Sequence, residues 1–161
     1  MIARLVRSAD FERVLRTRTR VSSLHFAVHH VAERPGVPAK RVAKAVPAEL
    51  STGAVPIEVQ PVDDSATAPS AEPPESVWLG TVVPKRHAKR SVTRSLLKRQ
   101  IRRAITDHAA SLAAGLWVVR LRAPFDKARF VSAASDDLQR VAREELDSLI
   151  GSAARRLAAG A

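Results

Sequence analysis

The sequence predicts an α+β fold in which helices pack on a sheet. Residues 24–31 alternate in polarity as a strand does, residues 116–121 form a short apolar run typical of a buried strand, and residues 91–112 carry an apolar stripe at helical spacing. A chain of 161 residues with 45% hydrophobic residues can bury one core. We therefore expect a single domain over residues 1–161.

The first elements are a short helix and a strand. Within residues 4–20, Phe11, Val14 and Leu15 share one helical face at positions i, i+3 and i+4. The alternating strand at 24–31 follows, and we expect Phe26 to pack in the core on one of its two faces.

Residues 32–76 differ in composition from the rest of the chain. They hold eight of the ten prolines among Ala, Ser, Glu and Val residues, a composition that packs poorly. We interpret them as a Pro-rich flexible insertion within the domain, with at most a short strand at 55–59.

After the insertion, a strand at 77–83 leads through a basic connection at 84–90 into a long helix at 91–112. A strand at 116–121 and a last helix that begins at 135 or 136 complete the chain. The apolar stripe of the long helix must dock on the sheet. Its members are Leu97, Ile101, Ala104, Ile105, His108 and Leu112.

Positive charge is concentrated in one stretch. The formal net charge is +11, and residues 77–103 contain nine basic residues and no acidic one. A merely solvated basic face would intersperse acidic residues, yet the first one after Glu75 is Asp107. Such a run repels itself unless a polyanion neutralises it, and nucleic acid is the most common such partner, so we expect a nucleic-acid-binding domain.

The basic residues lie on the connection and on the helix that follows it. Residues four apart on a helix are about 5 to 6 Å from each other, comparable to the phosphate spacing of a folded RNA backbone. Arginine grips phosphate with two hydrogen bonds, whereas lysine supplies a point charge. The predicted nucleic-acid contacts, which the resemblance described next assigns to RNA, are Lys85, Arg86, Lys89, Arg90, Arg94, Lys98, Arg99 and Arg102.

The segment from 84 to 103 resembles the signature of the bacterial ribonuclease P protein component. The family's Lys-Arg pair falls on Lys85 and Arg86, and its Arg-Asn-x-x-Lys-Arg-x-x-Arg pattern falls on residues 94–102, with Ser95 at the usual Asn position. The N-terminal stretch is similar to that family as well. The matching residues there are Arg4, Arg7, Asp10, Phe11 and Phe26.

The resemblance implies a two-layer α/β sandwich with a central mixed sheet, like the second domain of a small-subunit ribosomal protein, with a left-handed β-α-β crossover. It implies a protein subunit that assists a catalytic RNA in endonucleolytic removal of the 5′ leader from precursor tRNA. The protein would bind the RNA subunit and hold the leader in a cleft that includes Arg7, Phe11 and His29. Mg²⁺ would be held mainly by the RNA subunit. The expected location is the cytoplasm, with no membrane or DNA partner.

No residue of the chain is predicted to catalyse the reaction or to bind a metal. A strand sends His29 and His30 to opposite faces, and the chain has no cysteine and no His-Glu-x-x-His spacing. The alternative function is a non-catalytic basic RNA-binding or ribosome-associated protein. A helix-turn-helix DNA reader would need a helix shortly before residue 91, where a strand is predicted instead.

Overall fold

The computed structural model describes residues 2–36, 74–132 and 135–159. Residues 37–73, which include most of the expected insertion and its strand at 55–59, lie outside the described residues. The elements are β1 (Ile2–Arg4), α1 (Ser8–Arg16), β2 (Val21–Ser22), β3 (Phe26–Val31), β4 (Val77–Val82), α2 (Ser91–Asp107), a 3-10 turn (Ala109–Ser111), β5 (Gly115–Leu121) and α3 (Asp136–Ala159).

The strands form one mixed sheet in the order β1-β4-β5-β3-β2. β1 and β5 both run parallel to β4, and β3 runs antiparallel to β5 and to β2. The parallel pair β4 and β5 is connected through α2, as the sequence predicts. The α+β class and the mixed sheet are thereby confirmed.

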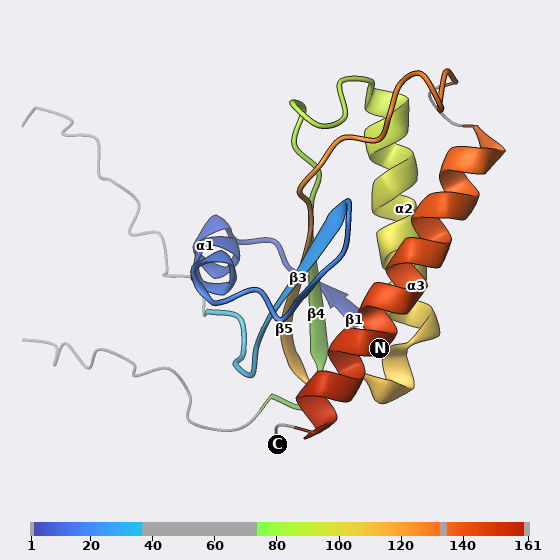
Figure 1. Ribbon diagram of the computed structural model, residues 1–161. Helices are drawn as coiled ribbons and strands as arrows, with labels where there is room; N and C mark the ends of the chain where they lie inside the picture. The colour runs from blue at the N-terminus through green and yellow to red at the C-terminus, as the bar shows by residue number, and fades with distance from the viewer. Residues whose placement is uncertain (1, 37–73, 133–134, 160–161) are drawn as a thin grey trace, which may run out of the picture. The chain divides into compact units, whose positions relative to one another are not determined.

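Helices cover both faces of the sheet (Figure 1). Trp117 and Val119 pack with α2 and α3, whereas the alternate residues Leu116 and Val118 pack with α1. The predicted two-layer arrangement is wrong in this respect. β5 is buried on both faces, so its second face needs the apolar side of α1 as a third layer.

The larger core lies between the sheet and the pair α2 and α3. Phe26 and the four stripe residues from Leu97 to Ile105 are buried in it, as predicted. His108 and Leu112 lie beyond α2, because the helix ends at Asp107 and a 3-10 turn follows. Among the described helices, none has the length and apolarity that would let it cross a membrane.

Gly115 begins β5 in a conformation that other residues rarely adopt. Its φ is +130°, and a Cβ there would lie 2.4 Å from the carbonyl oxygen of Val31. We expect Gly115→Ala to lower the free energy of unfolding by at least about 1 to 3 kcal/mol, the cost of a strained backbone. Urea unfolding measures this effect, and an unchanged midpoint would show that the strand end relaxes without cost.

Candidate nucleic-acid interface

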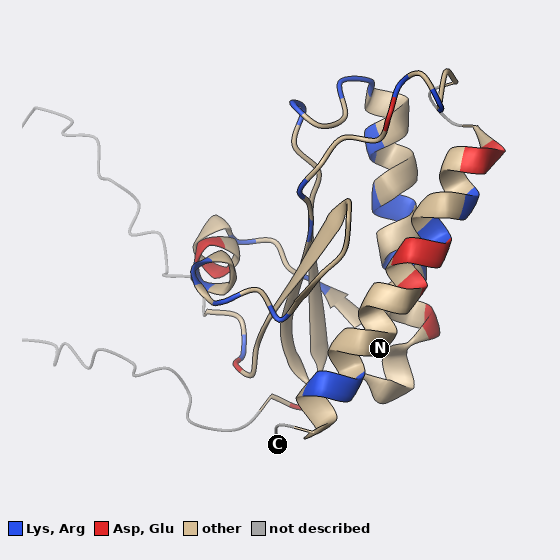
Figure 2. Ribbon diagram, in the orientation of Figure 1, with Lys and Arg blue, Asp and Glu red and all other residues tan. Residues whose placement is uncertain are grey.

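The buried face of α2 determines which basic side chains it exposes. Leu97, Ile101 and Ile105 are fully buried, which turns Lys98 and Arg102 outward to solvent. Figure 2 shows Lys and Arg along α2 and the connection before it, while the Asp and Glu residues of α3 lie on a different helix. On α2 itself, the one acidic residue is Asp107, 3.6 Å from Arg103.

Two of the predicted contact residues also hold the backbone in place. Arg94 is half-buried, and its Nη1 donates to the carbonyl oxygens of Ala88 at 3.1 Å and Lys89 at 2.7 Å. Arg90 donates to the carbonyl oxygen of Val131 at 3.1 Å, in the loop that follows β5. These bonds fix the connection before α2, so Arg94 and Arg90 position the neighbouring cations in addition to carrying charge.

The other six predicted contact residues are exposed. Arg86 donates to the ring of its neighbour His87 at 3.1 Å. No ion pair or hydrogen bond within the described part of the chain engages the side chains of Lys98, Arg99 or Arg102, so they are available to an external anion. We call the whole set the basic face: Lys85, Arg86, Lys89, Arg90, Arg94, Lys98, Arg99 and Arg102.

A cleft of about 370 Å³ runs beside the edge strand β1. Phe11 of α1 lines it together with Arg4 of β1, and Lys98 and Arg102 reach it from α2. The Phe11 ring lies against Gly80, where an added Cβ would be 2.5 Å from ring Cε1. We call this the edge cleft. In this cleft the Phe11 ring lies in the same lining as Lys98 and Arg102, two cations that were predicted to belong to a separate surface.

Arg7 and His29, the other two predicted leader contacts, are not among the residues that line the edge cleft. Arg7 precedes α1, and its guanidinium lies beside Gly36. His29 is 4% exposed, and its Nδ1 is 3.1 Å from the carbonyl oxygen of Thr17. In this structure His29 supports the end of α1, and Arg4 is the cation that sequence reasoning left out of the site.

The two central histidines of β3 are separated by the sheet, as predicted. His29 contacts Thr17, whereas the Nε2 of His30 lies 3.1 Å from the carbonyl oxygen of Ala114. Burial lowers the pKa of both rings below 6.5, although the backbone hydrogen bond opposes it in each case. A nearby arginine, Arg120 for His29 and Arg20 for His30, lowers the pKa further.

These buried rings predict a loss of stability in mild acid. Because each pKa is lower in the folded state, the unfolded chain takes up a proton first, and the stabilising contribution present above pH 6.5 is lost as the pH falls through the folded pKa. We expect His29→Asn to reduce the dependence of unfolding free energy on pH between about pH 7 and pH 5, by at most roughly 1.4 kcal/mol per pH unit. Urea titrations across this range measure the slope, and an identical slope in the variant would contradict the assignment.

Among the described residues, no group of three or more His, Asp and Glu side chains is arranged to hold a metal ion. The basic face and the edge cleft are surfaces of cations, and the Phe11 ring lines the cleft. Such an arrangement binds phosphates and unstacked bases.

Comparison with known proteins identifies the family. Residues 2–145 match the family model for ribonuclease P. The chain belongs to the bacterial ribonuclease P protein family. A ribonuclease P protein component of Burkholderia pseudomallei (strain 1106a) is 41% identical over 80 residues, which are 50% of this chain and 59% of that protein. One of Bordetella parapertussis is 39% identical over 87 residues, which are 54% of this chain and 67% of that protein.

The fold of the ribonuclease P protein from Staphylococcus aureus is similar to that of this chain. The TM-score is 0.54 at 18% identity, over 94% of this chain and 88% of that one. At this identity the likeness concerns the fold, with its three helices and five-stranded mixed sheet. The matched segment of this ribonuclease P family member spans about three fifths of the length of the Burkholderia relative.

Proposed function

We propose that this chain is the protein subunit of ribonuclease P and assists a catalytic RNA in removing the 5′ leader from precursor tRNA. Membership of the family and the basic face together support this function. The single observation that carries most weight is the exposure of Lys98, Arg99 and Arg102 on α2 with no acidic residue between 77 and 106. Cations in this density neutralise the repulsion between two large RNAs.

The basic face binds the RNA subunit in this proposal. Guanidinium groups make paired hydrogen bonds to phosphate, and the row along α2 repeats at every helical turn. Arg94 and Arg90 keep the connection at 84–90 in a fixed conformation, so that Lys85, Arg86 and Lys89 meet the RNA without a large loss of backbone entropy.

The edge cleft holds the single-stranded leader. The Phe11 ring offers a stacking surface that accepts any base, and Arg4, Lys98 and Arg102 offer charge to the phosphates beside it. Arg7 and His29 do not line the cleft; in this proposal His29 acts on the leader site indirectly, by supporting the end of α1 through Thr17. Because Lys98 and Arg102 belong to both surfaces, leader and RNA subunit would meet at α2.

Catalysis in this proposal belongs to the RNA. Mg²⁺ would supply an activated water and stabilise the leaving oxygen, and it would be held mainly by the RNA subunit. The residues of this chain bind and orient the two RNAs. The proposed location is the cytoplasm, and the proposed β4-α2-β5 crossover is left-handed, as in the second domain of a small-subunit ribosomal protein.

Sequencing the RNA that co-purifies with the full chain tests this function. We expect one abundant structured RNA together with precursor tRNAs that carry 5′ leaders. Enrichment of ribosomal RNA instead would favour the alternative, a ribosome-associated protein that binds RNA without a role in cleavage. Recovery of no RNA at low salt would contradict both functions.

A further inference from the structure

A second cavity lies at the corner where the 84–90 connection meets α2 and the loop after β5. Its volume is about 290 Å³. Its inner wall is apolar and its rim is cationic. We call it the corner pocket; the apolar lining comprises Ala88, Leu97, Phe125, Phe130 and Leu138, and the rim carries His87, Lys89, Arg90 and Lys127.

The walls of the corner pocket are held by contacts that reach the turn between β2 and β3 and, through it, α3. The Phe125 ring stacks on His25 at 3.9 Å between centroids and meets the edge of Phe130 at 5.8 Å. The His25 ring is 2.7 Å from a carboxylate oxygen of Glu145 on α3, and Arg90 ties the opposite rim to Val131. The cavity is therefore preformed, which lowers the entropy lost when a ligand binds.

Glu145 belongs to this support and does not face the ligand as a repulsive charge. Burial raises its pKa, but hydrogen bonds from the Ser23 hydroxyl and from the backbone and ring of His25 outweigh that effect and hold the pKa below its usual value. The Glu145 carboxylate therefore accepts its hydrogen bonds from Ser23 and His25 within the fold.

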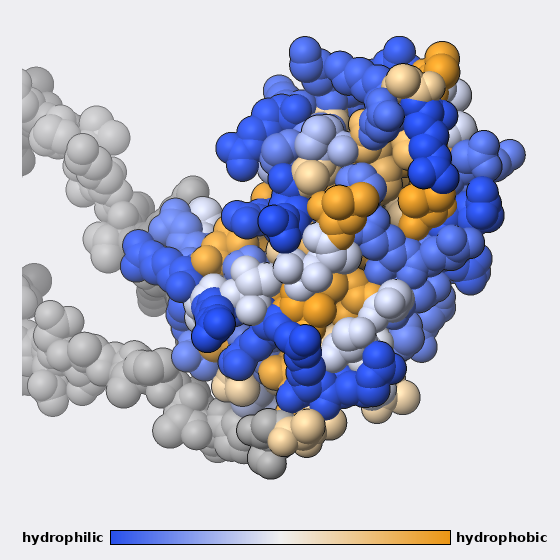
Figure 3. Space-filling model, viewed as in Figure 1, coloured by the Kyte–Doolittle hydropathy of each residue, from blue (hydrophilic) through white to orange (hydrophobic). Residues whose placement is uncertain are grey.

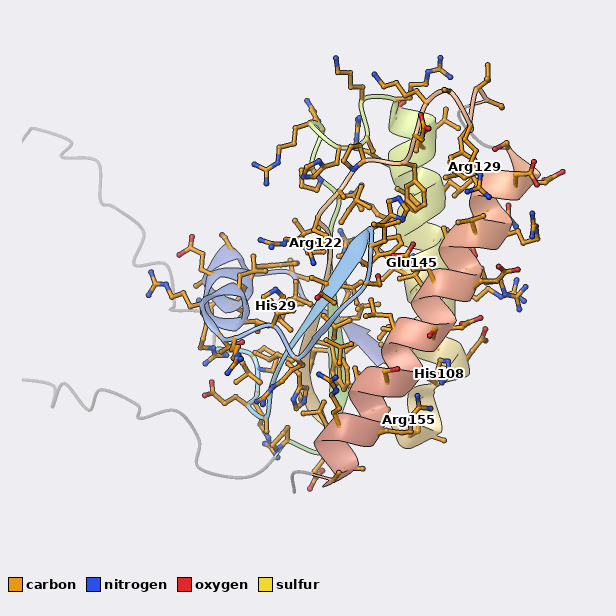
Figure 4. The ribbon with its side chains drawn as sticks, viewed as in Figure 1. His29, His108, Arg122, Arg129, Glu145 and Arg155 are labelled. Carbon is orange, nitrogen blue, oxygen red and sulfur yellow. The ribbon has the colours of Figure 1, made fainter. Side chains whose placement is uncertain are left out.

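The positive charge of the rim favours an anionic ligand. The one acidic residue of the neighbouring loop, Asp126, accepts the backbone N–H of Ala128 at 2.9 Å. Arg129 extends from the same loop (Figure 4), and its guanidinium lies 5.4 Å from the centroid of the Phe130 ring, where it adds positive charge beside the pocket. Figure 3 shows apolar surface between hydrophilic residues in the upper half of the view, where these segments lie. Apolar depth and a cationic rim together fit a ring system that carries a phosphate.

We propose that the corner pocket binds one unstacked nucleotide of a bound RNA. The base would pack against Phe130 and the exposed Val131, and its phosphate would meet Lys89, Arg90 and Lys127. Ligand pockets commonly measure about 300 to 1,000 Å³, so this pocket, at the lower end, suits one base and not a longer segment. The inference rests on the proposed function, because RNA on the basic face would bring the nucleotide to the rim.

Titration of the full chain with adenosine, guanosine, cytidine and uridine 5′-monophosphates, followed by NMR, tests the pocket without any large RNA. We expect amide shifts confined to residues 87–90 and 125–132, with shifts of the Phe130 ring and the Val131 methyls. Inorganic phosphate alone should shift the rim amides and leave the Phe130 ring unchanged. Absence of nucleotide binding, or shifts centred on Phe11, would overturn the proposal.

Two variants and a matched control make the assignment specific. Phe130→Leu keeps apolar volume but removes the ring, and we expect nucleotide affinity to fall about 5-fold or more, as for loss of base stacking. Lys127→Gln should weaken binding of the nucleotide and of phosphate alike. Arg155→Gln removes the same charge from an exposed site on α3 that is remote from the pocket and should change neither. An amide spectrum that matches the unaltered protein establishes that each variant is folded.

Binding to the co-purified structured RNA separates this inference from the proposed function. Phe130→Leu should weaken that binding with an unchanged salt dependence, because a ring releases no counterions. If Phe130→Leu leaves strong, salt-dependent RNA binding unchanged, the pocket proposal is wrong and the proposed function stands. Failure of the unaltered protein to bind RNA would defeat the proposed function, while the mononucleotide titration would still decide the pocket. Preference for an acidic amphipathic peptide over all four nucleotides would also overturn the proposal.

Discussion

The Lys98→Ala/Arg102→Ala double variant is expected to bind the RNA subunit about 30-fold more weakly at low salt, since two exposed charge contacts of about 1 kcal/mol each are lost. Each phosphate contact also contributes roughly 0.7 to 0.9 to the slope of log affinity against log salt. The slope should therefore fall by about 1.4 to 1.8. Titrations from low to high salt measure both quantities.

The matched control for this variant is Arg140→Ala/Arg143→Ala on α3. It removes the same two charges, but these arginines pair with Asp137, Glu144 and Asp147 on an acidic stretch of helix. We expect wild-type affinity and slope from it. Equal losses in the two double variants would mean that net charge alone drives binding, and an unaffected Lys98→Ala/Arg102→Ala variant would remove α2 from the interface. Arg94 is left intact in this test because it holds the carbonyls of Ala88 and Lys89.

Phe11→Ala is expected to reduce affinity for precursor tRNA by about 5- to 150-fold, because stacking of one base on an aromatic ring contributes roughly 1 to 3 kcal/mol. Affinity for mature tRNA, which has no leader to stack, should barely change. Parallel binding titrations of the assembled protein and RNA subunit with the two tRNAs measure the difference.

Phe11 also packs over Gly80 and the α1-facing core, so truncation alone costs stability. Phe11→Leu separates the two effects, since leucine retains most of the packing and lacks a ring. It should lose the preference for precursor tRNA while its thermal transition stays close to that of the unaltered protein. Equal losses for precursor and mature tRNA, in variants with cooperative transitions, would assign Phe11 to the core and not to the leader.

The elements with long, regular patterns could be predicted from the sequence. β4, α2 and β5 follow directly from an apolar strand, a helical stripe and a buried run. β1 has three residues and β2 has two, which is too short for any alternation to show. β1 exists because Ile2 pairs with Val77, a partner far along the chain that no local pattern indicates.

The width of the buried face of α2 was also underestimated. Leu96 and Gln100 are buried beside the predicted stripe, because α2 packs against both the sheet and α3. If α2 packed against the sheet alone, Leu96 and Gln100 would lie at the edge of its buried face. The helix also ends earlier than the stripe predicts: the backbone of His108 leaves the helical range at ψ 6°.

The residues of the basic face could be predicted because the charge of a side chain follows directly from its residue type. The way its members are held could not, since the bonds from Arg94 and Arg90 depend on the path of two loops. The edge cleft needs the parallel pairing of β1 with β4, which sets Arg4 next to Phe11 and Lys98. Hydrophobic periodicity alone assigns Arg4, Phe11 and Lys98 to three separate elements and does not indicate that they line one cleft.

Cleavage of precursor tRNA by the full chain combined with the structured RNA that co-purifies with it tests the central claim most directly. We expect release of the leader and a mature 5′ end at low Mg²⁺, at a rate well above that of the RNA alone, and a loss of this gain in the Lys98→Ala/Arg102→Ala variant. Equal rates with and without the protein, in a complex shown to be formed, would contradict the proposed role of this chain in cleavage.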